Sequence, residues 1–220
     1  KNKRIKMDVV AGAAVGWSET IIGFPFLTVK CLQQNNQKWF PLPFKRYYRG
    51  VKYPFCSSVM FNMMVFPLKD RTYPYTNSYV LSGILTGAAI TPIVYGIDMF
   101  TIRKQTGKPL EGLKMFKGMK GLGATFGKET VAMSAYFSTY HALRDDYGSL
   151  VAGGAAGLTN WTLSFPFDTI KSRQLSRQIS FKKAFSEGYL WTGFSIAALR
   201  SVIVNAVSFT VYEKTLLYLK

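Results

Sequence analysis

The sequence is poor in the residue types that build disulfide frameworks and metal centres. Its 220 residues include two cysteines, Cys31 and Cys56, and one histidine. Two cysteines cannot make a disulfide framework, and with a single histidine they offer no metal-ligand spacing. We therefore expect no metal site, and we interpret both thiols as packing residues.

Negative charge is also scarce, since 28 Lys and Arg face 11 Asp and Glu, a formal net charge of +17 at pH 7. Such an excess is typical of proteins that meet phosphate or anionic lipid. Apart from residues 1–6 there is no long basic run, and the other bases lie between apolar stretches, as contact with lipid headgroups requires. We expect anionic membrane lipids as partners, and no nucleic acid.

The residue patterns of enzymes are absent as well. No Cys and His pairing, no Ser, His and Asp spacing and no carboxylate cluster stands out, so we predict no enzyme and no catalytic residue. The glycine-rich stretch 118–129 lacks the Gly-Lys-Ser/Thr ending of a phosphate-binding loop. We expect no cofactor, except that bound cardiolipin stays open.

What the sequence does contain is a unit of roughly 72 residues that occurs three times. Glycines four residues apart mark three apolar segments: Gly12 and Gly16, Gly83 and Gly87, Gly153 and Gly157. We interpret these pairs as helix-packing positions. Nine residues after each pair begin the similar stretches PFLTVKCLQQ at Pro25, GIDMFTIRKQ at Gly96 and PFDTIKSRQL at Pro166. A second landmark recurs at Gly50, Gly121 and Gly193.

The repeat predicts an all-α membrane protein with six transmembrane helices, two in each unit. The apolar spans reach about 20 residues, enough to cross a bilayer. Polar residues within them, such as Ser18 and Asn160, must then face protein or water, which lowers the mean hydropathy to the observed +0.08. We place the repeats at 1–74, 75–146 and 147–220, within one structural domain.

These repeats resemble the mitochondrial carrier family over nearly the whole chain. The most specific element is PFDTIKSRQ, and Phe24-Pro25 and the tandem spacing support it. The resemblance implies three helix pairs around a pseudo-threefold axis, with a short amphipathic helix on the matrix side of each pair. It also implies a location in the inner mitochondrial membrane.

The resemblance implies a gate of ion pairs on the matrix side. Asp98 would pair with Lys171, and Asp168 with Lys30. The third link would join Leu27 and Thr101, which are both uncharged. Losing both members of a pair is physically coherent, because a single buried charge left without its partner costs several kcal/mol.

The same resemblance implies an opposite gate on the second helix of each repeat. Asp70 would pair with Arg144, and Glu213 would meet the hydroxyl of Tyr73. His141 would face an apolar residue, so the third link is lost here too. Weaker gates need less substrate binding energy to open.

Residues of the central substrate site can be carried over one by one: Ser57, Lys128 with Glu129, and Arg200. Arg200 is the strongest candidate, because an intramembrane arginine needs an anion and its planar guanidinium suits carboxylate or phosphate. Glu19 would be its resting partner. Structural ion pairs with Glu19 and Glu129 stay open as the alternative role of Arg200 and Lys128.

The implied function is a solute transporter that exchanges a small anionic or zwitterionic metabolite across the inner mitochondrial membrane by alternating access. A second hypothesis keeps the fold and drops transport. In it the chain is an accessory subunit of a larger membrane assembly, such as a respiratory-chain complex, with the other subunits as partners. Departures from the family pattern motivate this hypothesis: Leu27, Ser57, Gly96, Thr101 and Leu216.

Overall fold

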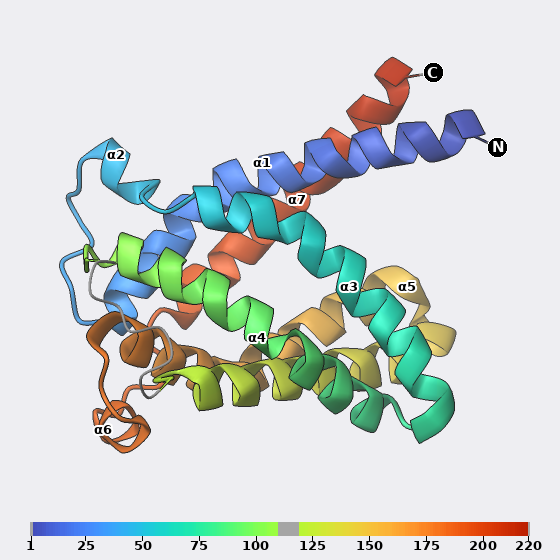
Figure 1. The fold of residues 1–220 in the computed structure, drawn as a ribbon. Helices are drawn as coiled ribbons and strands as arrows, with labels where there is room; N and C mark the ends of the chain where they lie inside the picture. The colour runs from blue at the N-terminus through green and yellow to red at the C-terminus, as the bar shows by residue number, and fades with distance from the viewer. Residues whose placement is uncertain (1, 110–118, 220) are drawn as a thin grey trace. The chain divides into compact units, whose positions relative to one another are not determined.

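The computed structural model describes residues 2–109 and 119–219, and every element in this part of the chain is a helix (Figure 1). The helices in chain order are α1 Asn2–Gln34, α2 Phe44–Tyr47, α3 Lys52–Thr76, α4 Tyr79–Gln105, α5 Leu122–Arg177, α6 Phe181–Ser186 and α7 Phe194–Leu219. The all-helical prediction is therefore correct at the level of secondary structure.

The longest element, α5, contains a break at Gly148. Its φ of 76° and ψ of 165° lie outside the helical region, in backbone space that glycine alone adopts readily. The break leaves a helical stretch on each side. Counted this way, the described residues hold six long helical segments and two short helices, α2 and α6.

Length and composition single out one helix of the described residues, α4, as able to cross a membrane. The prediction that six helices cross a membrane therefore stays a prediction. So does the division into three repeats, because contacts between Cα atoms group the chain differently.

These contacts divide the chain into two compact units. Unit 1 comprises Lys1–Met60, Phe100–Pro109 and Thr192–Lys220, and unit 2 comprises Phe61–Met99 and Leu110–Trp191. Unit 1 thus contains α1, α2 and α7, and unit 2 contains α5 and α6, while α3 and α4 contribute residues to both. Each unit is described by itself below.

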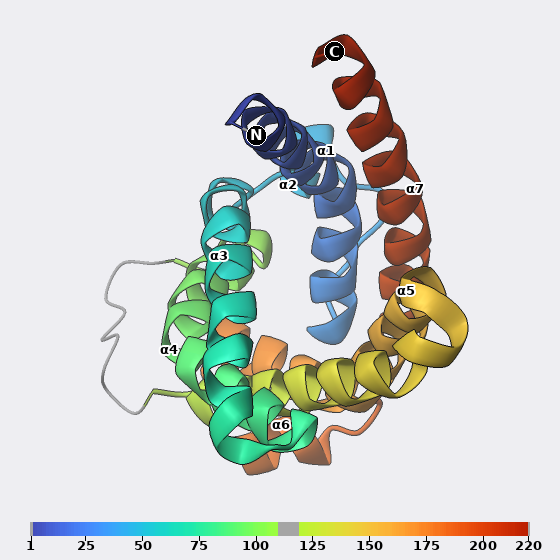
Figure 2. The ribbon, with the colours of Figure 1, turned by 90° about the vertical axis from the view of Figure 1, so that its right-hand side faces the viewer.

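In unit 1, α1 and α7 lie side by side, with the two chain ends at the same end of the pair (Figures 1 and 2). The connection after α1 folds back onto that helix. The Thr28 hydroxyl donates to the carbonyl oxygen of Tyr47 at 2.7 Å, and the Tyr48 hydroxyl donates to that of Ile21 at 3.1 Å. Phe24, which is fully buried, stacks on the ring of Tyr48. One hydroxyl of α1, one hydroxyl of the connection and the stacked rings therefore fix the course of the connection along α1.

In unit 2, α4 and α5 approach each other closely at two glycines. A Cβ built on Gly83 would lie 2.5 Å from Ser134 Cα, and one on Gly87 would lie 2.6 Å from the carbonyl oxygen of Glu129. Only residues without a Cβ permit this backbone contact. The adjoining core is formed by the buried side chains Val65, Ile90, Ala132, Met133 and Phe137.

The packing role predicted for the glycine pairs is thus confirmed for Gly83 and Gly87. For Gly16, Gly153 and Gly157 it stays a prediction, since nothing among the described residues lies within 4 Å of a Cβ built at these positions, and Gly12 lies outside the described side chains. The recurrence of Gly50, Gly121 and Gly193, the second landmark of the repeat, is explained by backbone conformation. Its three glycines precede α3, α5 and α7 with φ between 87° and 97°, a conformation that a side chain disfavours.

We predict that Gly83→Ala destabilises the protein by about 1–3 kcal/mol, because its methyl group would press on the backbone of Ser134. Gly96→Ala is the matched control on the same helix, since nothing lies within 4 Å of a Cβ there among the described residues. Its effect should be neutral or slightly stabilising, as alanine favours the helix. Thermal unfolding of the purified protein in detergent distinguishes the two, and equal midpoints for both variants would contradict the close approach.

Candidate functional site

A buried charge cluster in unit 2 centres on Lys171 of α5. Its Nζ lies 2.7 Å from Asp98 Oδ2, on α4, and 3.5 Å from Asp168 Oδ1, three residues earlier on its own helix. The side chains of Lys171 and Asp168 are 6% and 7% exposed, so each needs an opposite charge nearby. The structure thus brings together the predicted pair Asp98 and Lys171, and it adds Asp168 to the same ammonium group.

The second predicted link of the matrix gate pairs Asp168 with Lys30. Lys30 is buried in unit 1, where a Cβ built on Gly193 would lie 3.0 Å from Lys30 Cγ. Asp168 belongs to unit 2. This link therefore stays a prediction, as does the gate function of both pairs.

Two predicted substrate residues form an ion pair on α5. Lys128 Nζ lies 2.8 Å from Glu129 Oε1, and the side chain of Glu129 is 1% exposed. Its other oxygen, Oε2, is buried and has no hydrogen-bond partner among the described residues. A buried carboxylate oxygen without a donor is costly, and such groups are retained mainly where a ligand or ion can satisfy them.

Arg200 of α7 lies against α1 within unit 1. A Cβ on Gly23 would lie 2.8 Å from Arg200 Nε, so the guanidinium occupies space that glycine leaves free. That Nε is buried and has no hydrogen-bond partner among the described residues. Glu19 stands one helical turn before Gly23 on α1, and its role as the resting partner of Arg200 stays a prediction.

The residues predicted for the opposite gate have other neighbours. Asp70 pairs with the adjacent Lys69, with Nζ and Oδ1 2.7 Å apart, and its side chain is 69% exposed. The Arg144 guanidinium lies 6.0 Å from the ring centroid of Tyr140. Tyr73 stacks on Tyr79 with ring centroids 4.3 Å apart. The structure does not show an Asp70–Arg144 ion pair, so that link stays a prediction.

Some predictions fall beyond the described side chains. Ser57 and Glu213 lie outside the residues whose side chains the structure describes, so the meeting of Glu213 with Tyr73 is left open. Within the described residues, His, Cys, Asp and Glu form no group of three or more that could hold a metal ion. A bound cardiolipin stays a prediction.

Sequence reasoning missed a second charge cluster in unit 2, at the junction of α5 and α6. Arg177 makes two hydrogen bonds to the Glu187 carboxylate, at 2.9 and 2.6 Å. The nearly fully buried Arg173 donates to the carbonyl oxygens of Ala184 and Gly188 at 2.9 and 2.8 Å. Arg173 stands two residues after Lys171 in the stretch PFDTIKSRQ. This second base in the stretch is the sequence feature that could have indicated the cluster. Together these groups fix α6 against the end of α5.

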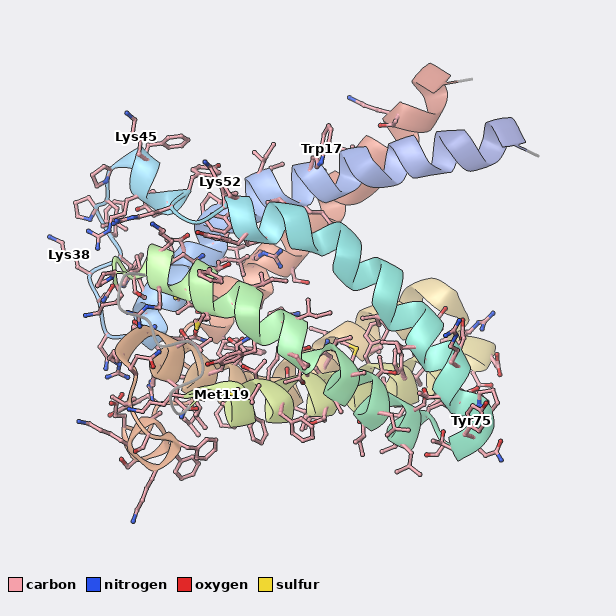
Figure 3. The ribbon with its side chains drawn as sticks, in the orientation of Figure 1. Trp17, Lys38, Lys45, Lys52, Tyr75 and Met119 are labelled. Carbon is pink, nitrogen blue, oxygen red and sulfur yellow. The ribbon has the colours of Figure 1, made fainter. Side chains whose placement is uncertain are left out.

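The connection between α1 and α3 in unit 1 forms a basic surface, with Lys38, Lys45 and Lys52 exposed along it (Figure 3). Trp39, Phe40 and Phe44 are exposed between these cations. No Asp or Glu occurs from residue 20 to residue 69. Exposed aromatic rings interleaved with lysines are typical of segments that lie at the headgroup level of a membrane.

Several known mitochondrial transporters are similar to this chain. The profile of the family described as mitochondrial carrier protein matches residues 144–220, which include Asp168, Lys171 and Arg200. The mitochondrial arginine transporter BAC2 of Arabidopsis thaliana is 27% identical, over 95% of this chain and 90% of its own. The chain is therefore similar to mitochondrial carriers over nearly its whole length, with the family profile matching its last third.

Other mitochondrial transporters match the chain to a similar extent. The mitochondrial basic amino acids transporter of Rattus norvegicus is 25% identical, over 97% of this chain and 90% of its own. The mitochondrial ornithine transporter 1 of Saccharomyces cerevisiae is 24% identical, over 94% of each chain. The relationship therefore spans nearly the whole chain at low identity.

We predict that Lys171→Met lowers the free energy of unfolding by about 3–5 kcal/mol, because it leaves two carboxylates together without their cation. Adding Asp98→Asn and Asp168→Asn to this variant should recover much of the loss, since no charge then remains at the site. Lys182→Met, at an exposed lysine of α6, is the matched control. Chemical unfolding in detergent micelles provides the measurement, and a Lys171→Met protein as stable as the control would refute the cluster.

We predict that the Arg177–Glu187 pair makes stability fall in acid. Its hydrogen bonds, and then the charge of Arg177, lower the pKa of the Glu187 carboxyl below its ordinary value. The contribution is therefore complete above the unfolded pKa of about 4.3 and is lost as the pH falls through the lower folded pKa.

Glu187→Gln lacks this titration, so its unfolding temperature should decline less steeply below about pH 4.3 than that of the unchanged protein. Asp146→Asn, at an exposed acid of α5, is the control and should keep the original slope. Identical pH profiles for Glu187→Gln and the unchanged protein would count against the pair.

Proposed function

We propose that the chain exchanges a small zwitterionic, amino-acid-like metabolite across the inner mitochondrial membrane. That it is a carrier-like solute transporter follows from its relatives, which are named as mitochondrial transporters. The substrate class rests on one observation, the buried Glu129 carboxylate with an unpartnered Oε2.

Glu129 is suited to an ammonium group. Lys128 already occupies Oε1, so the free Oε2 can accept one strong, charge-assisted hydrogen bond from a cationic N–H donor. A substrate that carried only negative charge would gain nothing from this carboxylate and would be repelled by it. Three relatives are named for arginine, basic amino acids and ornithine, which all carry such amino groups. Arg200 stays the predicted contact for the anionic group of the substrate.

The membrane location is proposed from the length of the helical segments and from the charge of the chain. The six long helical segments of the described residues are each long enough to span a bilayer, at 1.5 Å per residue. The basic, aromatic connection between α1 and α3 supports contact with anionic lipid headgroups. In alternating access, the Lys171 cluster would have to open and close, which makes it the candidate gate.

The relatives do not favour the second hypothesis, an accessory subunit that has lost transport. They are named as transporters of metabolites and amino acids. Members of the family are transporters rather than enzymes, so catalysis is not proposed.

We predict that the protein reconstituted in liposomes exchanges arginine or ornithine, and that Glu129→Gln slows this exchange about 10- to 100-fold. The expected loss is that of one charge-assisted hydrogen bond, about 1.5–3 kcal/mol. Asp146→Asn, which changes an exposed acid on the same helix, is the matched control and should transport normally. Thermal unfolding of each variant checks that the fold is intact.

Two results would contradict this proposal in different ways. Full exchange by Glu129→Gln would show that this carboxylate does not contact the substrate. Exchange of dicarboxylates or nucleotides, with none of amino acids, would refute the substrate class and leave the transporter assignment in place.

A further inference from the structure

A hollow in unit 2 is lined by Arg144, which the sequence predicts for the opposite gate, but not by Glu129, the proposed substrate contact. It is a cavity of about 300 Å³ between α3 and the part of α5 before Gly148. Its lining consists of Lys69, Tyr136, Phe137, Tyr140, His141 and Arg144. Three of these side chains carry nitrogen donors, and the other three are aromatic rings.

The aromatic wall is a continuous surface on one face of α5. Tyr136 and Tyr140 are one helical turn apart, and their rings are nearly parallel, 4° apart in plane with centroids separated by 6.2 Å. The ring of Tyr140 meets that of His141 edge to face. The opposite side of His141 is covered by Tyr79, whose ring stacks on it at 3.8 Å. Tyr79 thereby holds the imidazole in a fixed orientation beside the cavity.

The cations of the cavity exceed its carboxylates. Arg144 has no carboxylate within 4 Å among the described residues, and its guanidinium lies over the Tyr140 ring instead. Asp70 is taken up by Lys69 in a largely exposed ion pair. Asp145 follows Arg144 in sequence and is exposed to solvent. Arg144 is itself exposed, and a guanidinium over an aromatic ring without a carboxylate partner is suited to receive an anion.

We propose that this cavity binds a small planar carboxylate, a one-ring aromatic acid being the type. The carboxylate would accept hydrogen bonds from Arg144 and Lys69, and the ring would pack on Tyr136 and Tyr140. The volume is at the lower end of the range for small-molecule pockets, which begins at about 300 Å³, and it excludes ligands of several rings. This binding does not rest on transport, so either proposal can fail without the other.

The test is calorimetric titration of benzoate into the purified protein in lipid nanodiscs. Benzoate should bind with a single site, while acetate, which lacks the ring, and benzyl alcohol, which lacks the charge, should bind at least about tenfold more weakly. Arg144→Gln and Lys69→Gln should each weaken benzoate binding about 10- to 100-fold. Arg71→Gln is the matched control, because Arg71 is an exposed cation on α3 that does not line the cavity.

Two variants at Tyr140 test the aromatic wall without changing any charge. Tyr140→Phe keeps the ring and should keep binding, whereas Tyr140→Leu should lose it. Several results would overturn the proposal: no benzoate binding, equal binding by Arg144→Gln and Arg71→Gln, or equal binding of acetate and benzoate. Loss of binding in Arg200→Gln alone would also overturn it, because benzoate would then occupy the predicted transport site.

Discussion

Burying charge among helices is the constraint on which the described structure depends most. An ammonium or carboxylate removed from water must find its opposite charge, or it destabilises the fold by several kcal/mol. Lys171 meets this requirement with Asp98 and Asp168, which joins α4 to α5. Arg173 meets it with backbone carbonyls at α6, and it lies 3.6 Å from Glu187. The positions of three helices in unit 2 therefore follow from where two buried cations find their partners.

The sequence predicted those features that repeat or that depend on local chemistry. Helix content follows from a spacing that recurs at nearly the same interval, and the pairing of Asp98 with Lys171 follows from the resemblance to mitochondrial carriers. Features that depend on one particular neighbour were not predictable. Asp70 pairs with Lys69 because an exposed acid beside a lysine gains little by reaching across to another helix. Gly83 and Gly153 occupy equivalent places in the repeat, yet only Gly83 contacts another backbone, which sequence spacing cannot reveal.

The distribution of charge along the chain adds a second level of organisation. Acids are missing from residue 20 to residue 69, where the connection between α1 and α3 exposes lysines and aromatic rings. Buried acids occur instead on α5, as Glu129 and Asp168. The exposed lysines of this connection thus lie in unit 1, and the buried carboxylates Glu129 and Asp168 lie in unit 2. A protein proposed to lie among anionic lipids and to bind a cationic amino group needs this separation, because a carboxylate at the headgroup level would be repelled.

Helix α4 contacts α5 through an ion pair and α1 through a neutral hydrogen bond. In unit 2 its Asp98 makes an ion pair with α5, whereas in unit 1 its Gln105 donates to the Thr28 hydroxyl of α1 at 3.3 Å. Leu27 and Thr101, the neutral link of the predicted matrix gate, both belong to unit 1. A neutral hydrogen bond contributes about 0.5–1.5 kcal/mol, less than a bond to a charged group. Breaking the bond between Gln105 and Thr28 should therefore cost less than separating Asp98 from Lys171, which makes the contact with α5 the stronger of these two interactions of α4.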